Sequence, residues 1–329
     1  MNITVIGAGA WGTALAISLS ASHRVTLWAR DAAQIEAMRA TRSNQRYLPD
    51  ILLPDSLELS ADFSAALDEV ELAIIAVPAA ALRTMLQQLA SSGRCCDVVW
   101  VCKGFEAETS LLPHQVAAEI LPEEFRRGVL SGPSFAQEVA RGLPTALTLA
   151  SADEEFACRT AQALHHARLR IYASNDVVGV EVGGAVKNVM AIAAGICDGM
   201  GLGYNARAAL LTRGLAEITR LGLKLGGRPE TLGGLSGAGD LILTCTGDLS
   251  RNRQVGLLLA QQHDLSEILR RLGHVAEGVY TVREVHRLAQ RLGVAMPIGE
   301  AVYRVLYEHV PVAEAVTELL NRAPNHEFQ

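Results

Sequence analysis

The stretch NITVIGAGAWGTAL, residues 2–15, decides the fold of this chain. Its apolar, β-prone start breaks at Gly7, Gly9 and Gly12, and a run of small residues with helical character follows. In such a strand, turn and helix the first glycine permits the sharp bend, the second lets a pyrophosphate approach the backbone, and the third lets the helix pack on the strand. Free N–H groups at the helix start then face the pyrophosphate. A glycine-rich loop is the simpler interpretation, but the flanking strand and helix favour a dinucleotide-binding turn.

Length, composition and charge narrow the class of protein. At 329 residues the chain exceeds what one hydrophobic core usually serves, so we expect two domains. Half of the residues are hydrophobic and 5% are aromatic, which indicates a compact globular protein. A net charge of −6 argues against a broad basic surface, so we expect no nucleic-acid partner. A local basic pocket for an anionic metabolite remains compatible with that charge.

The sequence also bears on location and redox state. No uninterrupted apolar run approaches the roughly 20 residues of a membrane span, and the first strand begins too close to Met1 for a signal peptide. We therefore expect a cytoplasmic protein without membrane insertion. The six cysteines form no CxxC pair and show no ligand-like spacing with the nine histidines, so we expect reduced, mostly buried thiols and no metal site. They are Cys95, Cys96, Cys102, Cys158, Cys197 and Cys245.

The first half of the chain alternates apolar, β-branched runs with helix-like segments. This alternation predicts a doubly wound, mostly parallel α/β sheet with helices on both faces. Further strands are expected at 25–28, 72–77, 98–102, 128–130, 146–150 and 169–172. Helices are expected at 32–42, 79–90 and 113–120.

Near Asp176 the character of the sequence changes to long Ala, Leu, Glu and Arg stretches, which predict an all-α remainder. Helices are expected at 206–221, 251–262, 281–291 and 298–308, and the Gly and Pro clusters 222–229 and 233–239 are expected to be loops between helices. We therefore expect a dinucleotide-binding domain at 1–177 and a helical domain at 178–329.

The end of the second strand bears on the choice of cofactor. An acidic residue there commonly binds the ribose 2′-hydroxyl of NAD, whereas an arginine accommodates the 2′-phosphate of NADP. Here Ala29 stands where the acid is expected, and Arg30 follows with its planar fork of donors. This order predicts a preference for NADPH over NADH. The alternative is a surface Arg30 that pairs with Asp31.

Two stretches of the second half carry polar residues in apolar surroundings. Lys187 and Asn188 interrupt a helix of small apolar residues, where desolvation would lower the lysine pKa toward neutrality. The alternative is a lysine that extends to the surface. Further on, Asp240 and Thr244 are four residues apart, so they share one face if Asp240 opens a short helix.

The segment after that short helix has the composition of a phosphate site. Ser250 is the expected N-cap of a helix whose first turn carries Arg251 and Asn252. Backbone N–H groups, the helix dipole and a guanidinium would converge on a phosphate monoester there. An ordinary capped helix is the alternative.

Seven motifs occur in order along the chain. They are Gly-Ala-Gly-x-Trp-Gly-Thr-Ala at 7–14, Lys103-Gly104, Gly132-Pro133-Ser134-Phe135-Ala136, Lys187-Asn188, Gly237-Ala238-Gly239-Asp240-Leu241, Ser250-Arg251-Asn252 and Glu277-Gly278. Together they resemble the bacterial NAD(P)-dependent sn-glycerol-3-phosphate dehydrogenases, over Met1 to about Arg304. The tail beyond Arg304 carries none of the motifs.

The resemblance implies reversible reduction of dihydroxyacetone phosphate to sn-glycerol 3-phosphate, the backbone precursor of phospholipids, with NADPH or NADH. It implies an N-terminal Rossmann domain, a helical C-terminal domain and an active site between them. Lys187 would be the proton donor and acceptor. Substrate would contact Lys103, Gly132, Ser134, Lys187, Asp240, Ser250, Arg251 and Asn252. The cofactor would contact Gly7, Gly9, Ala10, Trp11, Gly12, Arg30, Lys103, Ala136, Arg251, Val275 and Glu277.

These residues suggest a mechanism in which protonated Lys187 stabilises the developing alkoxide and donates a proton, and Asp240 and Asn188 orient the ammonium. Thr244, on the Asp240 face, completes the catalytic set. Desolvation lowers the pKa of Lys187 and the charge of Asp240 raises it, and the sequence leaves open which effect is larger.

Other functions are compatible with parts of this pattern. A related Rossmann dehydrogenase acting on a β-hydroxy acid would also use a helical second domain and a lysine-asparagine pair, with Arg251 holding a carboxylate. A non-catalytic redox sensor would explain the glycines but would leave Lys187 and Asp240 without a role. Apolar helices of the second half could pair in a homodimer.

Overall fold

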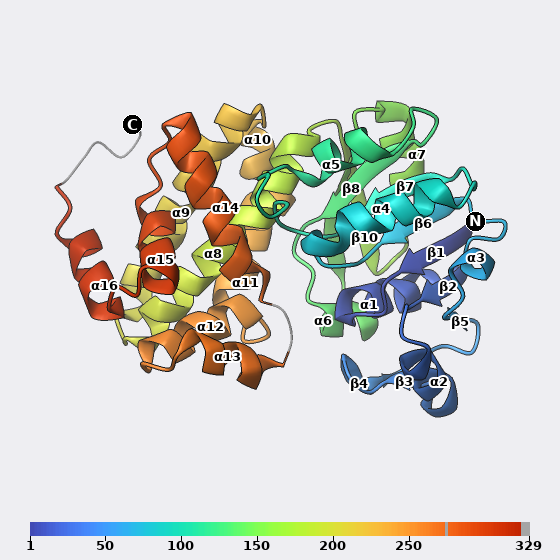
Figure 1. The fold of residues 1–329 in the computed structure, drawn as a ribbon, viewed down its shortest axis with the longest axis horizontal. Coiled ribbons are helices and arrows are strands. Elements are labelled where there is room, and N and C mark those ends of the chain that lie inside the picture. Colours follow the sequence, from blue (N-terminus) through green and yellow to red (C-terminus); the bar gives the residue numbers. More distant parts are fainter. Residues whose placement is uncertain (274–275, 324–329) are drawn as a thin grey trace.

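The computed structural model describes residues 1–273 and 276–323, and it begins with an eight-stranded sheet (Figure 1). The strand order is β10-β9-β8-β7-β6-β1-β2-β5, and all neighbours are parallel except β8 and β9. From β5 to β8 this is the 3-2-1-4-5-6 order of dinucleotide-binding folds. The strands are β1 (Asn2–Ile6), β2 (Arg24–Trp28), β5 (Glu58–Ser60), β6 (Leu72–Ile75), β7 (Asp97–Trp100), β8 (Arg127–Ser131), β9 (Thr145–Ala150) and β10 (Leu169–Ser174).

Helices cover both faces of this sheet because side chains alternate along each strand. Val5 of β1 lies in a core with α1 (Ala10–Leu19), α2 (Ala32–Thr41) and α7 (Glu154–Leu164). Ile6 lies in the core of the opposite face. That face packs on α3 (Phe63–Ala66), α4 (Leu82–Ser91), which follows the short helix η1 (Ala79–Ala81), and α5 (Pro113–Ile120). The predicted doubly wound, mostly parallel sheet is confirmed.

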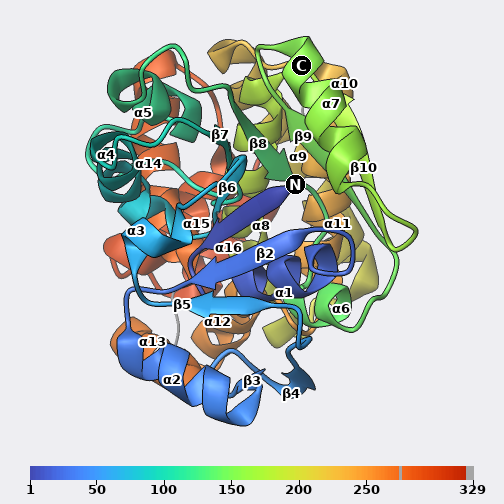
Figure 2. The same ribbon diagram turned by 90° about the vertical axis from the view of Figure 1, so that its right-hand side faces the viewer.

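A small two-stranded sheet was not predicted. Strands β3 (Ser43–Asn44) and β4 (Leu48–Leu52) pair antiparallel and lie beside α2 at the bottom of Figure 2. Leu48 and Ile51 pack against Ala14 of α1 and against Val139 of α6 (Ala136–Ala140). The apolar contacts hold this segment beside the glycine turn.

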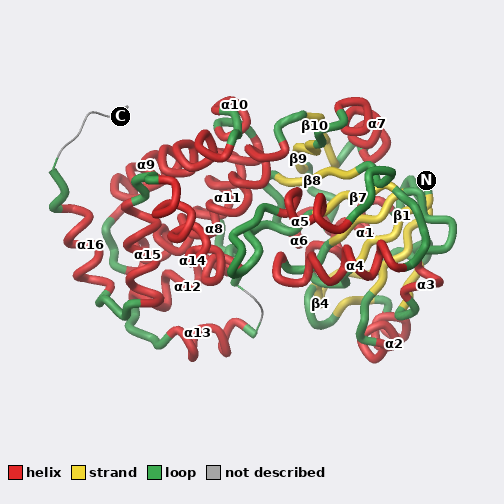
Figure 3. Tube along the Cα trace, turned by 45° about the horizontal axis from the view of Figure 1, so that its top comes forward, coloured by secondary structure: helices red, strands yellow, loops and turns green. Residues whose placement is uncertain are grey.

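The rest of the described chain is helical and gathers around one central helix, α8 (Figure 3). By composition α8 is apolar and long enough to cross a membrane, but 89% of its most apolar window is buried inside the protein. It is therefore the core of the helical part. The helices are α8 (Val177–Gly199), α9 (Gly203–Leu225), α10 (Pro229–Leu232), η2 (Leu235–Gly239), α11 (Asp240–Thr246), α12 (Arg251–Ala260), α13 (Leu265–Leu272), α14 (Glu277–Leu292), α15 (Pro297–Tyr307) and α16 (Val312–Leu320).

Two predicted loops were partly wrong. Helix α9 continues through Gly222 to Leu225, and residues 235–239 form the π-helical turn η2, which leads directly into α11. The glycines serve close packing at these positions: a Cβ on Gly222 would lie 2.5 Å from Leu232 Cδ1, and one on Gly237 would lie 1.9 Å from the Leu232 carbonyl oxygen. Gly222 and Gly237 are therefore needed because other segments pack closely against them, and not because the chain reverses there.

The sheet part and the helical part interlock through the loop between β7 and α5. Phe105 and Leu112 of this loop belong to the hydrophobic core of the helical part. Ser110 Oγ donates a hydrogen bond of 2.6 Å to the buried carboxylate of Glu284 on α14. The loop begins at the C-terminal end of β7, next to Lys103, so these contacts hold the two parts together beside the predicted site.

Candidate active site

The glycine turn has the geometry that a dinucleotide requires. Gly7 has a φ of +119°, and a Cβ on it would lie 2.6 Å from the Ala76 carbonyl oxygen, so only glycine fits. A Cβ on Gly12 would lie 1.9 Å from the Gly7 carbonyl oxygen, which brings α1 directly against the turn. A Cβ on Gly9 would meet no described atom within 4 Å. The flank of Gly9, beside the free N–H groups of the first turn of α1, is therefore open to a pyrophosphate.

Trp11 adds a second observation that fits a cofactor. Ala10 and Trp11 lie in the first turn of α1, and Trp11 packs against the same apolar cluster as Ala136, the first residue of α6. The indole Nε1 of Trp11 is buried and has no hydrogen-bond partner in the described part of the chain. A buried donor without a partner is costly, so an acceptor brought by a ligand would relieve it.

At the end of β2 the structure places Arg30 on the surface and leaves its guanidinium exposed. Asp31 accepts hydrogen bonds from the N–H groups of Ala33 and Gln34 and so caps α2. Among the described residues no ion pair joins Arg30 to Asp31. The alternative interpretation of Arg30 as a partner of Asp31 is therefore not supported.

The predicted catalytic residues meet at a buried carboxylate. Lys187 Nζ, on α8, donates to Asp240 Oδ1 and, at 2.9 Å, to Thr244 Oγ1. Lys103 Nζ donates to the other oxygen, Asp240 Oδ2, at 2.6 Å. The side chains of Lys187 and Asp240 are 8% and 1% exposed, so the surface interpretation of Lys187 is wrong. Two ammonium groups from the two parts of the molecule thus share one carboxylate.

Local structure explains why Asp240 faces the lysines. It is the first residue of α11, as the sequence predicts, and Thr244 follows one turn later on the same face. The Thr244 hydroxyl donates to the Asp240 carbonyl oxygen at 2.7 Å, so its oxygen stays directed at Lys187. Helix α11 therefore presents a carboxylate and a hydroxyl oxygen to the same ammonium.

Burial decides the protonation behaviour of Lys187. Desolvation lowers the pKa of Lys187 to about 8, the charge of Asp240 opposes this shift, and the charge of Lys103 adds to it. The effect of desolvation on the Lys187 pKa is therefore larger than that of the Asp240 charge, which the sequence alone left open. A lysine with a pKa near 8 exchanges its proton readily around neutral pH.

The carboxyl ends of the parallel strands bring Lys103, Gly132 and Ser134 together. Lys103 follows β7, and Gly132 and Ser134 follow β8. Lys103 Nζ donates to the Gly132 carbonyl oxygen at 3.0 Å and lies 3.5 Å from Ser134 Oγ. This edge of the sheet is where open α/β folds bind their ligands.

The predicted phosphate segment forms as expected at its N-cap. Ser250 Oγ accepts the Arg253 N–H at 3.2 Å and caps α12, and Arg251 is exposed in the first turn. Asn252 is buried, and its Oδ1 accepts the N–H of Gly278 at 3.0 Å. The segment therefore offers an exposed guanidinium in the first turn of α12, a helix of ten residues.

The structure places the Asn188 amide away from the Lys187 ammonium that it was expected to orient. Its Oδ1 accepts a hydrogen bond from Asn252 Nδ2 at 2.9 Å, and its Nδ2 lies 3.5 Å from the Gly184 carbonyl oxygen. Within residues 1–273 and 276–323 no hydrogen bond joins Asn188 to Lys187. Asn188 lies one residue after Lys187, about 100° around the helix, so its amide reaches α12 instead of the ammonium.

Glu277 and Val275 complete the predicted cofactor set. Glu277 opens α14; burial raises the pKa of its carboxyl, and the charge of Arg251 opposes the rise. Val275 lies outside the described residues.

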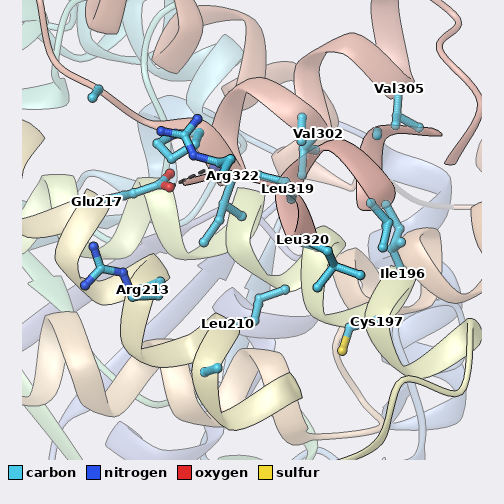
Figure 4. Close-up of a pocket in the computed structure, with 18 of the residues that line it drawn as sticks. Ile196, Cys197, Leu210, Arg213, Glu217, Val302, Val305, Leu319, Leu320 and Arg322 are labelled. Carbon is cyan, nitrogen blue, oxygen red and sulfur yellow. Dashed lines mark hydrogen bonds between the residues drawn. The ribbon is translucent and has the colours of Figure 1, made fainter. Parts of the chain in front are cut away.

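A large cavity lies away from these residues. It measures about 1230 Å³ and is lined mainly by aliphatic side chains of α8, α9, α15 and α16 (Figure 4). None of the predicted catalytic, substrate or cofactor residues lines it. The buried ammonium cluster therefore marks the candidate active site, and the cavity requires another explanation.

Two residues beside the glycine turn were not predicted from the sequence. Gln34 Nε2 and Asn44 Nδ2 both donate to the carbonyl oxygen of Ala8, at 2.9 and 3.0 Å. A single amide residue in a polar segment gives no signal in one sequence, because its partner is distant along the chain.

Comparisons with known proteins identify the family of this chain. The N-terminal and C-terminal family models of NAD-dependent glycerol-3-phosphate dehydrogenase match residues 2–157 and 176–317. A glycerol-3-phosphate dehydrogenase (NAD(P)+) of Thiobacillus denitrificans is 62% identical over all of both chains, and one of Nitrosomonas eutropha is 60% identical over 99% of each. The crystal structure of a glycerol-3-phosphate dehydrogenase from Coxiella burnetii superposes with a TM-score of 0.94 at 42% identity, covering 98% of this chain and 99% of that one. The chain therefore belongs to the NAD-dependent glycerol-3-phosphate dehydrogenase family.

Proposed function

We propose that this protein reversibly reduces dihydroxyacetone phosphate to sn-glycerol 3-phosphate with NAD(P)H, and that Lys187 is its proton donor and acceptor. The observation that carries the proposal is the buried Lys187 ammonium between Asp240 and Thr244, with a pKa of about 8. The high identity to named glycerol-3-phosphate dehydrogenases favours this substrate over a β-hydroxy acid and over a sensor without turnover.

The proton step follows from the position of Lys187. When bound, the reduced nicotinamide supplies hydride to the substrate carbonyl carbon. Protonated Lys187 stabilises the negative charge that develops on the carbonyl oxygen and transfers one proton to it, so that the oxygen becomes a hydroxyl. In the reverse direction the neutral amine removes that proton. Asp240 and Thr244 hold Nζ in place for both directions.

Positive charge around the site suits an anionic substrate. Lys103 lies beside Lys187, and Arg251 is exposed in the first turn of α12. We infer that Arg251, with the N-terminal N–H groups of α12 and with Lys103, holds the substrate phosphate. Binding this remote group would fix the carbonyl in place for reaction.

We also propose that NADPH is preferred. Gly7, Gly9 and Gly12 would form the pyrophosphate turn, and the exposed Arg30 at the end of β2 would pair with the 2′-phosphate. The product is the backbone precursor of phospholipids, so we assign the enzyme to lipid precursor supply in the cytoplasm.

We propose a homodimer as the explanation of the large cavity. Leu202, Leu223 and Leu320 line it and are exposed, so the cavity opens onto an apolar surface. Isolated proteins rarely leave such a surface uncovered. A two-fold contact between copies would cover the same apolar surface of both chains. A second copy is therefore the occupant we propose.

The first experiment mixes purified protein with dihydroxyacetone phosphate and follows the loss of reduced-nicotinamide absorbance, with NADPH and NADH in parallel. We expect rapid loss with the wild type. Lys187→Ala should lower kcat at least about a hundredfold while NADPH still binds, because it removes a general acid. Arg251→Ala should mainly raise KM for the substrate. Arg168→Ala, which removes an exposed cation just before β10, is the control and should leave turnover unchanged.

Two results would contradict the proposal. Unchanged turnover in Lys187→Ala would remove the lysine from the chemistry. Cofactor binding without turnover of dihydroxyacetone phosphate, together with activity on a β-hydroxy acid, would favour the related dehydrogenases.

A further inference from the structure

Asn44 connects the unpredicted two-stranded sheet to the glycine turn. Its side chain is buried, and Nδ2 donates both of its protons, to the Ala8 carbonyl oxygen at 3.0 Å and to Thr13 Oγ1 at 2.8 Å. Ala8 lies inside the turn, and Thr13 lies in the first turns of α1. One amide therefore spans the turn from its beginning to the helix that follows it.

The hydrogen bond to Ala8 fixes the direction of a neighbouring donor. The peptide unit is planar and trans, so the carbonyl of Ala8 and the N–H of Gly9 point in opposite directions. Asn44 and Gln34 hold the Ala8 oxygen from one side. The Gly9 N–H therefore points toward the opposite edge of that peptide unit, away from Asn44 and Gln34, and Gly9 is the glycine of the turn whose flank is open.

The hydrogen bond from Asn44 to Thr13 holds the start of α1, which follows the glycine turn. The Thr13 N–H donates to the Gly9 carbonyl oxygen at 3.0 Å, which closes the first turn of α1. Thr13 is fully buried, so its hydroxyl needs a partner inside the protein. Asn44 Nδ2 is that partner. Because the same amide also donates to the Ala8 carbonyl oxygen, it links the first turn of α1 to the glycine turn.

Asn44 is held in place independently of the cofactor site. It pairs with Leu48 in the β3–β4 ladder, and its carbonyl oxygen accepts the Tyr47 N–H at 3.1 Å. Leu48 packs against Ala14 and Val139. Asn44 Oδ1 is buried and has no hydrogen-bond partner among the described residues. The chain thus keeps an amide here at the cost of one unsatisfied acceptor, which favours a role for its two donors.

From these contacts we propose that Asn44 is a positioning residue for cofactor binding: it holds the Ala8 carbonyl and Thr13 so that the Gly9 N–H faces the pyrophosphate. The inference rests on the proposed use of this turn for NAD(P)H. It concerns the pyrophosphate, which NADPH, NADH and ADP-ribose share. It does not depend on the proposed roles of Arg30 and Lys187.

The test measures cofactor affinity without turnover. Asn44→Asp keeps the shape of the side chain but replaces the two donors by an oxygen that repels the Ala8 carbonyl. We expect its Kd for NADPH, NADH and ADP-ribose to rise by a common factor of about tenfold or more, the value of a lost hydrogen bond to a fixed group. KM for dihydroxyacetone phosphate at saturating NADPH should change less than twofold, since the substrate residues are untouched.

Two further variants keep the inference falsifiable if Asn44→Asp fails to fold. Gln34→Ala removes only the second donor to Ala8 and should raise the same three Kd values by a smaller common factor. Gln45→Ala removes the exposed neighbouring amide, which contacts Ser43, and should leave them unchanged.

Three results would overturn the positioning role. They are folded Asn44→Asp with wild-type Kd values, a lowered melting temperature as its only effect, or a selective loss of NADPH over NADH. Failure of dihydroxyacetone phosphate turnover in the wild type would remove the proposed substrate and leave the Asn44 measurement intact.

Discussion

Burial lowers the pKa of Lys187 and the charge of Asp240 raises it, and the resulting pKa can be measured from the pH dependence of the reaction. Reduction of dihydroxyacetone phosphate requires the protonated lysine, so kcat should fall as pH rises above about 8, whereas oxidation of sn-glycerol 3-phosphate should rise through the same range. Asp240 raises the lysine pKa against the effect of burial. In Asp240→Asn the fall in the reduction rate should therefore begin at lower pH. The pH profiles of kcat in both directions test this, and a midpoint that stays in place or moves upward would contradict it.

Arg30 is expected to give the protein a higher affinity for NADPH than for NADH, because only NADPH carries a 2′-phosphate. The exposed guanidinium can pair with the 2′-phosphate of NADPH, and NADH has no such group. We expect Arg30→Ala to raise Kd for NADPH about tenfold and Kd for NADH less than threefold. Titration of both reduced cofactors by fluorescence gives the two values, and Arg270→Ala on α13 is an exposed control. Equal weakening of both cofactors would refute the assignment.

Single residues also show where sequence reasoning succeeds and where it stops. Ser250 as an N-cap and Asp240 with Thr244 on one helix face are local patterns, and both were predicted. The contact of Lys103 with Asp240 joins residues 137 positions apart, and no local pattern reveals it. Neither spacing nor resemblance predicted that Asn188 would turn to Asn252, because that orientation depends on how α12 packs on α8.

Among the elements, α15 depends on a carboxylate from another helix. Glu217 of α9 is buried and accepts the N–H groups of Ile298 and Gly299, at 2.7 and 3.1 Å, in the first turn of α15. Glu217→Ala would leave two buried donors without partners and should lower the unfolding free energy by about 2 kcal/mol or more. Chemical denaturation measures the difference between wild type and variant.

The same carboxylate makes that difference depend on pH. Burial raises the pKa of Glu217 to about 7, so the folded protein binds a proton more tightly than the unfolded chain between about pH 4.5 and 7. This group therefore contributes stability at low pH that is lost as the pH rises through that window. The wild type and Glu217→Ala should differ more at pH 5 than at pH 8. Equal differences at the two pH values would show that Glu217 does not titrate in this range.

The elements divide into those with periodic sequences and those held by distant contacts. The strands β1, β2, β6 and β7, the helices α2, α4 and α5, and the long helices α9, α12, α14 and α15 follow from hydrophobic pattern and were predicted, whereas β5 and α3 were not. Strand β3 has only two polar residues and β4 is interrupted by Pro49 and Asp50, so neither gives a clear pattern; they form where Leu48 and Ile51 pack against Ala14 and Val139. The turn η2 was mistaken for a loop because its glycines, which usually break helices, serve close packing here.

Across the whole molecule, the apolar cavity of Figure 4 predicts the oligomeric state. We expect light scattering on a sizing column to give twice the chain mass for the wild type. Leu320→Glu places a charge on that surface and should shift the protein toward the monomer. Leu52→Glu changes an equally exposed leucine on β4, far along the chain, and should leave the dimer intact. A wild type that is monomeric at every concentration would exclude the dimer.

The loop that carries Phe105 and Leu112 into the helical core has a consequence for recombination between relatives. Consider a chimera of two relatives that is joined in the short connection between β10 and α8. Its helices would come from one parent, whereas Phe105 and Leu112, which help to fill the core of those helices, would come from the other. Compatible exchange therefore requires residues 104–112 to travel with the helices, although they are encoded in the opposite half of the gene. In this chain the unit that can be inherited as a module is discontinuous in sequence.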